Sequence, residues 1–153
     1  MNAKIELKVS AIKDGTVIDH IPAKDLFKVV AILGLDHIDN AITIGNNLES
    51  AKLGKKAIIK ISDKFFETEE INKIALVAPE AKLNIIRDYQ VVEKKVVETP
   101  KEMVIGIAKC MNPKCITNND KVTTKFTVLI DEELALKCVY CEKITDHDHM
   151  VIL

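Results

Sequence analysis

The four cysteines of the chain lie in its last third, as two pairs. Four residues separate Cys110 from Cys115, two separate Cys138 from Cys141, and 22 lie between the pairs. Two short cysteine loops that face each other across β-strands make a tetrahedral four-thiolate site, which suits zinc. Because the protein would supply all four ligands, no position is left for water and substrate. The spacing therefore predicts one structural Zn²⁺ rather than a catalytic one.

Three other uses of these cysteines stay open from the spacing alone. Two disulfides are one alternative, although the N-terminus lacks the apolar central region of a secretory signal and thiols stay reduced inside cells. A redox Cys-x2-Cys is the second, and it leaves the first pair of cysteines without a role. Iron is the third, since four thiolates also bind iron.

A metal ion has a physical reason to lie in this part of the chain. The segment from residue 101 to the end has 53 residues. Domains of that size have a small hydrophobic core, so they often need a disulfide or a bound metal ion for stability. Zinc binding supplies roughly 10–16 kcal/mol of apparent free energy in comparable peptides. We therefore expect metal removal to unfold residues 101–153 and to leave residues 1–98 folded.

Charge and hydropathy narrow the classes of function. The 153 residues include 22 basic and 23 acidic side chains, for a net charge of −1. Phosphate binding along a nucleic acid needs a basic surplus, so a zinc-ribbon nucleic-acid-binding factor is only the second interpretation. The sequence contains no run of about 18 apolar residues, which is the length that would predict a membrane span. We expect a cytoplasmic protein without nucleic-acid or membrane partners.

Catalytic motifs are missing from the sequence. It has no Gly-x-Ser-x-Gly and no phosphate-loop motif, and the cysteines are assigned to the metal. An enzyme is therefore disfavoured. The run Asp-His-Asp-His at 146–149 is either a second metal patch or, more commonly for such a run, a solvated segment.

The elements that must position these residues follow from the periodicity of apolar side chains. Period-two alternation predicts strands, and stripes at helical spacing predict helices, with Gly34 as the stop of the first helix and Thr68 as the cap of the second. Asp14-Gly15 predicts a hairpin after the first strand. The expected strands are 4–12, 16–21, 40–48, 56–63 and 83–94, with helices at 23–35 and 67–79, and then short strands at 103–110, 123–130 and 134–141.

The order of these elements indicates the fold class. After the N-terminal hairpin arm, the order strand, helix, strand, strand, helix, strand predicts an α+β fold, a ferredoxin-like βαββαβ sandwich with both helices on one face of an antiparallel sheet. The charged segment 94–104 contains Pro100 and reads as a boundary. We therefore expect an N-terminal domain over 1–98 and a small all-β zinc-binding domain over 101–153.

Several segments together resemble a known family. They are KDGTVIDHIPA at 13–23, ITIGNNL at 42–48, GKKAIIKI at 54–61, IALVAP at 74–79, and the cage CMNPKCI with LKCVYCEK. In this order and over essentially the whole chain, they resemble the regulatory chain of aspartate carbamoyltransferase.

The resemblance implies a non-catalytic allosteric subunit of an enzyme of pyrimidine biosynthesis. It implies that the N-terminal domain binds nucleotide effectors, with CTP and UTP inhibiting and ATP activating. It further implies a homodimer of regulatory chains, and a zinc domain that docks on the catalytic chain and transmits the signal.

The resemblance also implies which residues bind the nucleotide. Lys94 and His20 would meet phosphates, while Lys60 and Asp19 would bond the ribose and base edges. Ser10 departs from an acidic residue that is frequent in the family, and the loop at 46–56 departs in detail, so effector preference can differ. The full set is Val9, Ala11, Ile12, Asp19, His20, Lys56, Lys60, Asn84, Ile86, Tyr89, Val91 and Lys94.

Overall fold

The structure is a computed structural model, and it describes residues 11–101, 103–130 and 133–153. The strand expected over 4–12 falls mostly outside these residues, as do Val9 and Ser10. Ala11 and Ile12, which are described, have no regular secondary structure. In the described part of the chain, no helix combines the length and the apolar character that a membrane crossing requires.

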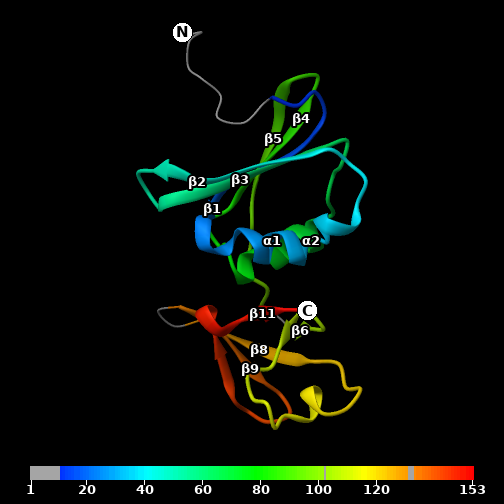
Figure 1. Cartoon of the computed structure of the whole chain (residues 1–153), viewed down its shortest axis with the longest axis vertical. Coiled ribbons are helices and arrows are strands. Elements are labelled where there is room, and N and C mark those ends of the chain that lie inside the picture. Colours follow the sequence, from blue (N-terminus) through cyan, green and yellow to red (C-terminus); the bar gives the residue numbers. More distant parts are fainter. Residues whose placement is uncertain (1–10, 102, 131–132) are drawn as a thin grey trace.

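The N-terminal part is built on an antiparallel sheet of five strands in the order β2-β3-β1-β4-β5. Helices α1 (Leu26–Ile32) and α2 (Thr68–Lys73) cover one face of this sheet (Figure 1). The order confirms the predicted α+β class, with a ferredoxin-like arrangement extended by one edge strand. The strands are β1 (Gly15–Pro22), β2 (Ile42–Ser50), β3 (Gly54–Ser62), β4 (Lys82–Arg87) and β5 (Gln90–Val96).

The single strand predicted over 83–94 is wrong, because the chain turns back at Asp88 and Tyr89. Both residues have positive φ angles, 51° and 65°, which the Asp-Tyr sequence gives little reason to expect. Contacts from outside the hairpin hold this turn. The Asp88 N–H donates to Asp14 Oδ1 at 3.0 Å, and the Tyr89 N–H donates to the Lys13 carbonyl at 2.9 Å.

Both helices are shorter than predicted, because one-turn 3-10 segments flank them. Segment η1 (Ala23–Asp25) precedes α1, and Gly34 at φ 63° follows its end, as expected for a left-handed stop. Segment η3 (Ile74–Leu76) continues α2. The N-cap of α2 is Glu67, not Thr68. The Glu67 N–H donates to Glu70 Oε1 at 3.2 Å in a capping box. A capping box usually begins with Ser or Thr, so the Glu-x-x-Glu sequence did not predict it.

The core of the N-terminal part lies between the sheet and the helices. Apolar side chains of the strands face inward, because period-two alternation places them on the helix-covered face. They pack against the apolar stripes of α1 and of the α2–η3 segment. The fully buried members include Ile18, Ile59, Leu83, Val29, Ile71 and Ile74.

The C-terminal part is an all-β unit, as predicted. It has a four-stranded sheet in the order β10-β9-β8-β6 and a two-stranded ladder of β11 with β7. Gly106, at φ 71°, breaks the strand predicted over 103–110 into two. The strands are β6 (Val104–Ile105), β7 (Ala108–Lys109), β8 (Lys125–Ile130), β9 (Leu134–Cys138), β10 (Ile144–Asp146) and β11 (Val151–Ile152), with 3-10 turns η4 (Ile116–Asn118) and η5 (His147–His149).

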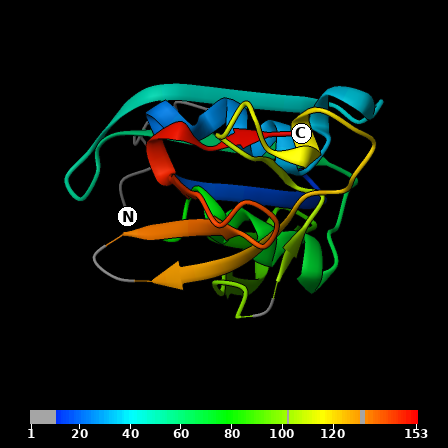
Figure 2. The ribbon, with the colours of Figure 1, turned by 90° about the horizontal axis from the view of Figure 1, so that it is seen from below.

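The C-terminal part packs beneath the helix layer, on the side away from the N-terminal sheet. Figure 2, seen from below, shows its strands in front of the helices. Polar contacts join the two parts: His147 Nε2 lies 3.1 Å from the Val77 carbonyl oxygen, and Lys28 Nζ donates to the His147 carbonyl at 3.2 Å. The buried apolar residues of both parts belong to one continuous cluster.

Candidate functional site

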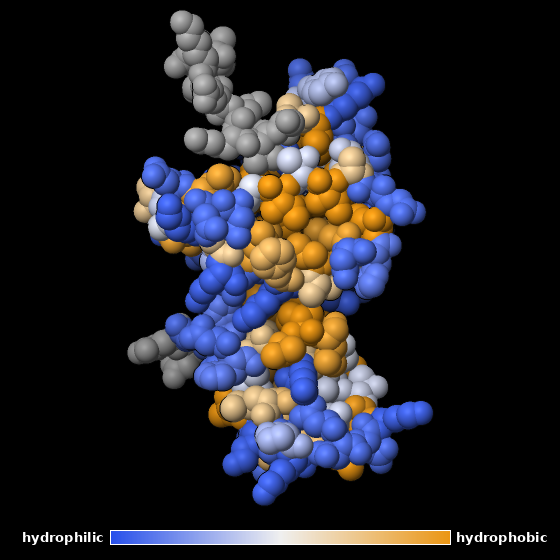
Figure 3. Space-filling view, viewed as in Figure 1, coloured by the Kyte–Doolittle hydropathy of each residue, from blue (hydrophilic) through white to orange (hydrophobic). Residues whose placement is uncertain are grey.

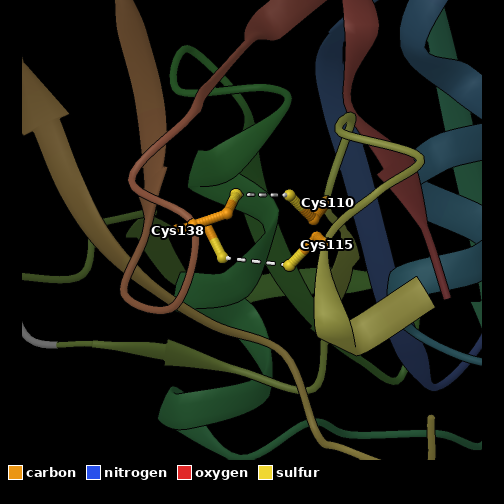
Figure 4. A group of neighbouring side chains, drawn as sticks. Cys110, Cys115 and Cys138 are labelled. Carbon is orange, nitrogen blue, oxygen red and sulfur yellow. Dashed lines mark hydrogen bonds between the residues drawn. The ribbon is translucent and has the colours of Figure 1, made fainter. Parts of the chain in front are cut away.

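The C-terminal part holds the four cysteines at the ends of short strands. Cys110 directly follows β7 and Cys115 directly precedes η4, so both lie in one loop. Cys138 ends β9, and Cys141 lies in the turn from β9 to β10. Figure 4 shows the side chains of the first loop pointing toward Cys138 from the opposite side. The fold thus closes two cysteine loops on one point, as the spacing predicts.

The distances between sulfur atoms fit one metal ion. Cys110 Sγ lies 3.6 Å from Cys141 Sγ, and Cys115 Sγ lies 3.7 Å from Cys138 Sγ. All four sulfurs lie within 4.8 Å of one another, and three of the four cysteines are buried. A tetrahedron with zinc–sulfur bonds of about 2.3 Å has edges of about 3.8 Å. The cluster therefore matches a structural site closed by four protein ligands.

Side-chain amides clamp the first cysteine loop. Asn118 Nδ2 donates to the carbonyls of Cys110 at 2.9 Å and of Asn112 at 2.7 Å. Asn119 Nδ2 donates to the Cys115 carbonyl at 2.7 Å. These bonds hold the loop in shape, so the orientation of its two ligands does not depend on the metal alone.

The second loop is held by its backbone. The Glu142 N–H donates to the Cys138 carbonyl at 3.0 Å, and the Cys138 N–H donates to the Lys143 carbonyl at 3.0 Å. Glu142 has a φ of 64°, the left-handed conformation that lets this tight turn close. The side chain of Cys141 is thereby directed back toward Cys138.

Burial sets the ionisation of the thiols. It raises the pKa of Cys110 to about 12 and also raises the pKa of Cys138. For Cys141 burial acts in the same direction, but hydrogen bonds from the Asn112 side chain, the Lys143 backbone and neighbouring thiols outweigh it and lower the pKa to about 7. Four thiolates in such a site need a bound cation, which deprotonates its ligands.

The lysines near the ligands lie on the surface. All four that flank the cysteines are exposed: Lys109, Lys114, Lys137 and Lys143. Burial is the largest influence on the pKa values of Cys110, Cys138 and Cys141, and hydrogen bonds from amide groups act against it. Short-range donors, rather than these ammonium groups, are therefore the charge-stabilising groups next to the sulfurs.

The Asp-His-Asp-His run has a different use from metal binding. The Asp146 carboxylate accepts from the His149 N–H at 2.9 Å and lies 2.6 Å from His149 Nδ1, inside one turn. His147 points to the N-terminal part. Among the described residues, the only group of three or more potential ligands that could hold a metal is the cysteine cluster.

The second candidate site lies on the face of the N-terminal sheet that the helices leave uncovered. Strand register places five residues in one row across this face, because directly paired residues point to the same side. The pairs are Thr43 with Lys60, Lys60 with Val17, Val17 with Asn84, and Asn84 with Lys94. Three predicted residues from three strands are thereby brought together.

Polar groups gather on one side of this row, where β1 bulges. The ladder between β1 and β3 shifts between Ile18 and Ile21, and His20 has a φ of 61°. The Asp19 carboxylate pairs with Lys56 Nζ at 3.0 Å and accepts from the His20 N–H at 2.7 Å. The bulge thus directs Asp19, His20 and Lys56 to one place.

The opposite side of the row is apolar and partly open. Ile86 is buried and pairs with Val91, which is 49 % exposed. Tyr89 is 66 % exposed in the adjoining turn, beside the segment of Ala11 and Ile12 through its bond to Lys13. The predicted residues of β4 and β5 therefore line one strip, apolar beside Ile86 and basic beside Asn84 and Lys94.

A cavity of about 380 Å³ occupies the basic end, and three of its lining residues were not predicted. They are Lys82, Lys95 and Val96. Period-two counting from Asn84 along β4 would have pointed to Lys82, because alternate residues of a strand share a face. Lys95 and Val96 follow from the β4–β5 hairpin, which the sequence did not reveal.

Lys60 is the most unusual charge on this face. It is 9 % exposed, and burial lowers its pKa, while the nearby Asp19 carboxylate acts in the opposite direction. A lysine held on a sheet face under such desolvation has a cost for folding. It is a candidate for ligand binding on that physical ground.

Comparisons with known proteins cover nearly the whole chain. The family model of the aspartate carbamoyltransferase regulatory chain, allosteric domain, matches residues 7–98, and that of its metal binding domain matches residues 102–151. The chain is 62 % identical over 140 residues to the aspartate carbamoyltransferase regulatory chain of Phocaeicola vulgatus, covering 92 % of this chain and 90 % of that protein. It is 57 % identical over 150 residues to that of Bacteroides fragilis, covering 98 % and 97 %. It is 53 % identical over 148 residues to that of Pyrococcus horikoshii, covering 95 % and 97 %.

Proposed function

The chain belongs to the family of aspartate carbamoyltransferase regulatory chains, and from this we propose that it binds nucleotide effectors on the uncovered face of its sheet and transmits their binding to the catalytic chain. It is a non-catalytic subunit of an enzyme of pyrimidine biosynthesis. We propose two units, residues 1–98 for the effector and 101–153 for zinc and docking. Cytoplasmic localisation is part of the proposal.

The effectors that we propose are CTP, UTP and ATP. The observation that carries this is the row of Lys60, Asn84 and Lys94 across the sheet face, with the apolar Ile86 on one side of it and the basic cavity on the other. An apolar end suits a base, and ammonium groups suit phosphates. Strand backbone groups beside Ile86 and Tyr89 offer donors and acceptors that can tell a pyrimidine from a purine.

We propose that Zn²⁺ is held by Cys110, Cys115, Cys138 and Cys141. The sulfur distances and the closed, buried donor set support it. Bound zinc would deprotonate the thiols and supply folding free energy, because the small sheet it staples has little core of its own. The chain's own amide bonds then hold both loops in place for docking.

The catalytic chain is the partner that the family implies, and the surface around the cysteines suits it. Several apolar side chains there are about half exposed, among them Met111, Ile116, Tyr140 and Ile144. Exposed apolar groups clustered on a small rigid unit are typical of a protein interface. We propose that segments 111–120 and 131–149 include the docking contacts.

A homodimer of regulatory chains is also part of the proposal. Figure 3 shows an apolar patch over β2 and α1, where Ile44 is 44 % and Phe27 is 74 % exposed. Strand β2 is an edge of the sheet that the structure describes, and it has no lysine or proline, two residue types that protect an edge against pairing with another strand. A second copy of the chain would cover both features.

The test is calorimetric titration of CTP and then of ATP into the purified, zinc-loaded chain. We expect saturable binding of both at one site per chain, with ATP displaced by CTP. Addition of the catalytic chain should then give an enzyme whose activity responds to both nucleotides. A zinc-loaded, folded chain that binds neither nucleotide, alone or assembled, would contradict the effector site.

A further inference from the structure

The basic end of the sheet face contains a lysine outside the predicted nucleotide set. Lys82 begins β4 and lines the cavity of about 380 Å³ together with His20, Asn84 and Lys94. Its place in the sheet is well defined, because it pairs with Asp19 on β1 and with Val96 on β5. Lys82 therefore shares the face of Asp19, Asn84 and Lys94.

The register also brings Lys82 close to Lys94. Asn84 pairs with Lys94 and Lys82 pairs with Val96, so the two lysines are diagonal neighbours on one face of adjacent strands. Diagonal Cβ atoms lie roughly 7–8 Å apart, within reach of long side chains. Two ammonium groups in that position repel each other unless an anion lies between them.

The neighbouring carboxylates form their ion pairs with other lysines. Asp19 is held by Lys56 at 3.0 Å, Glu93 by Lys95 at 3.6 Å, and Glu80 by Lys52 at 2.8 Å. Within residues 11–101, 103–130 and 133–153, neither Lys82 nor Lys94 forms an ion pair with a carboxylate. His20 adds a buried Nδ1 atom without a hydrogen-bond partner in the same described part.

Distance along β4 decides which part of a nucleotide reaches Lys82. Ile86, Asn84 and Lys82 point to the same face, and Lys82 lies four residues from Ile86. Four residues of strand span about 13 Å. A base seated beside Ile86 would place its first phosphate near Asn84 and Lys94, and only a longer phosphate chain would extend to Lys82.

We propose that Lys82 binds the outer phosphates of the effector and makes the site select nucleoside triphosphates over monophosphates. This inference rests on the proposed function and adds a residue and a specificity to it. Lys82 and Lys94 bind the phosphate chain at two points, and His20 lies beside them. Charge-assisted bonds to phosphate supply the binding energy.

The experiment compares Lys82→Met with the zinc-loaded wild-type chain, in calorimetric titrations of CTP and of CMP. We expect Lys82→Met to weaken CTP binding about tenfold and to change CMP binding less than twofold. Lys82→Glu should weaken CTP binding further, because it replaces attraction by repulsion. Lys73→Met is the matched control: this lysine is exposed in the last turn of α2, and its loss should leave both affinities unchanged.

Two results would overturn the inference while the proposed function stands. One is wild-type affinity of Lys82→Met for CTP, and the other is an equal loss for CTP and CMP, which would mean a role in folding or in base binding. A wild-type chain that binds neither nucleotide would instead remove the proposed function, and this inference with it.

Discussion

At the scale of single residues, Lys60 combines burial with charge in a way that folding alone does not favour. Among the lysines that the structure describes, it is the one in the buried class. Its pKa is lowered by burial, and Asp19 opposes this only in part. Protein stability rarely improves by burying an ammonium group. A group kept at such a cost usually serves binding or chemistry.

Lys60→Met is therefore expected to separate stability from binding. The variant should unfold at the same or a higher denaturant concentration, because methionine fills a similar volume without desolvation of a charge, and it should bind CTP at least tenfold more weakly. Lys55→Met is the control, since Lys55 lies on the same strand and is exposed. Chemical denaturation and calorimetry measure the two effects, and unchanged CTP affinity would remove Lys60 from the site.

The pH dependence of the same pair of proteins gives an independent check. The folded state lowers the pKa of Lys60 below 10.5, so folding opposes protonation of this group. Below the lowered pKa the penalty is full, and it disappears as the pH rises toward 10.5. The stability advantage of Lys60→Met over the wild type should therefore shrink with rising pH over that alkaline window.

At the scale of elements, short strands and their loops position the four cysteine ligands. Strand β9 pairs with β8 and β10 and ends at Cys138, so one ligand is part of the sheet. The neighbouring ligands lie in loops held by Asn118 and by backbone bonds of Cys138. The sheet and the metal site therefore depend on each other.

Cys138→Ser is expected to lose zinc and to unfold the C-terminal sheet. Serine is a poor zinc ligand at neutral pH, and three thiolates leave the site open. Zinc content should fall below one per chain, and limited proteolysis should cleave within residues 101–153 while residues 11–98 resist. Thr127→Ser, on the exposed side of the adjacent strand β8, is the control. A variant without zinc whose C-terminal part resists protease would contradict the proposal that the metal stabilises the fold of this part.

The β4–β5 hairpin is the second element that positions candidate site residues. It carries Lys94 on β5 and the exposed Tyr89 in its turn. A single long strand would have carried Lys94 past the edge of the site. The reversal at Asp88 and Tyr89 brings Lys94 beside Asn84 instead, and it makes the basic cavity.

At the scale of the whole molecule, the start of α1 meets the C-terminal part through a buried carboxylate. Asp25 is 2 % exposed, and its Oδ1 lies 3.5 Å from His147 Nε2 and 3.9 Å from Lys28 Nζ. The Val77 carbonyl lies 3.1 Å from the same His147 nitrogen. Both neighbours are acceptors, so Nε2 carries a proton and donates. His147 thereby contacts two elements of the N-terminal part at once.

His147→Ala is expected to weaken the connection between the two parts. It leaves the Asp25 carboxylate and the Val77 carbonyl without this donor, which costs about 1–3 kcal/mol in a buried setting. Zinc content and CTP affinity of the isolated chain should stay the same, while the response of the assembled enzyme to CTP should fall. His149→Ala is the control, because His149 is exposed and its hydrogen bonds to described residues lie within its own turn. An unchanged CTP response in the assembly would assign transmission to the apolar contacts.

The sequence by itself determined features that depend on short stretches of chain. Each pair of cysteines forms a tight loop, because only four and two residues intervene, and this spacing predicted one metal ion shared by both loops. The α+β class and most strands also follow from local periodicity, and the helix stop at Gly34 from its freedom to adopt positive φ. The resemblance of ordered motifs identified the family, since their combination is far more specific than any one of them.

Only the tertiary structure decided which distant residues share a place. The reversal at Asp88–Tyr89 is held by bonds to Asp14 and Lys13, more than 70 residues away, and the local sequence offers only the tolerance of Asp88 for positive φ. The diagonal placement of Lys82 and Lys94 depends on that reversal and on strand register. The contact of His147 with Asp25 depends on the packing of two parts of the chain. Each of these is set by long-range pairing, whose outcome rests on burial and hydrogen bonding of the complete fold rather than on the neighbours of a residue in sequence.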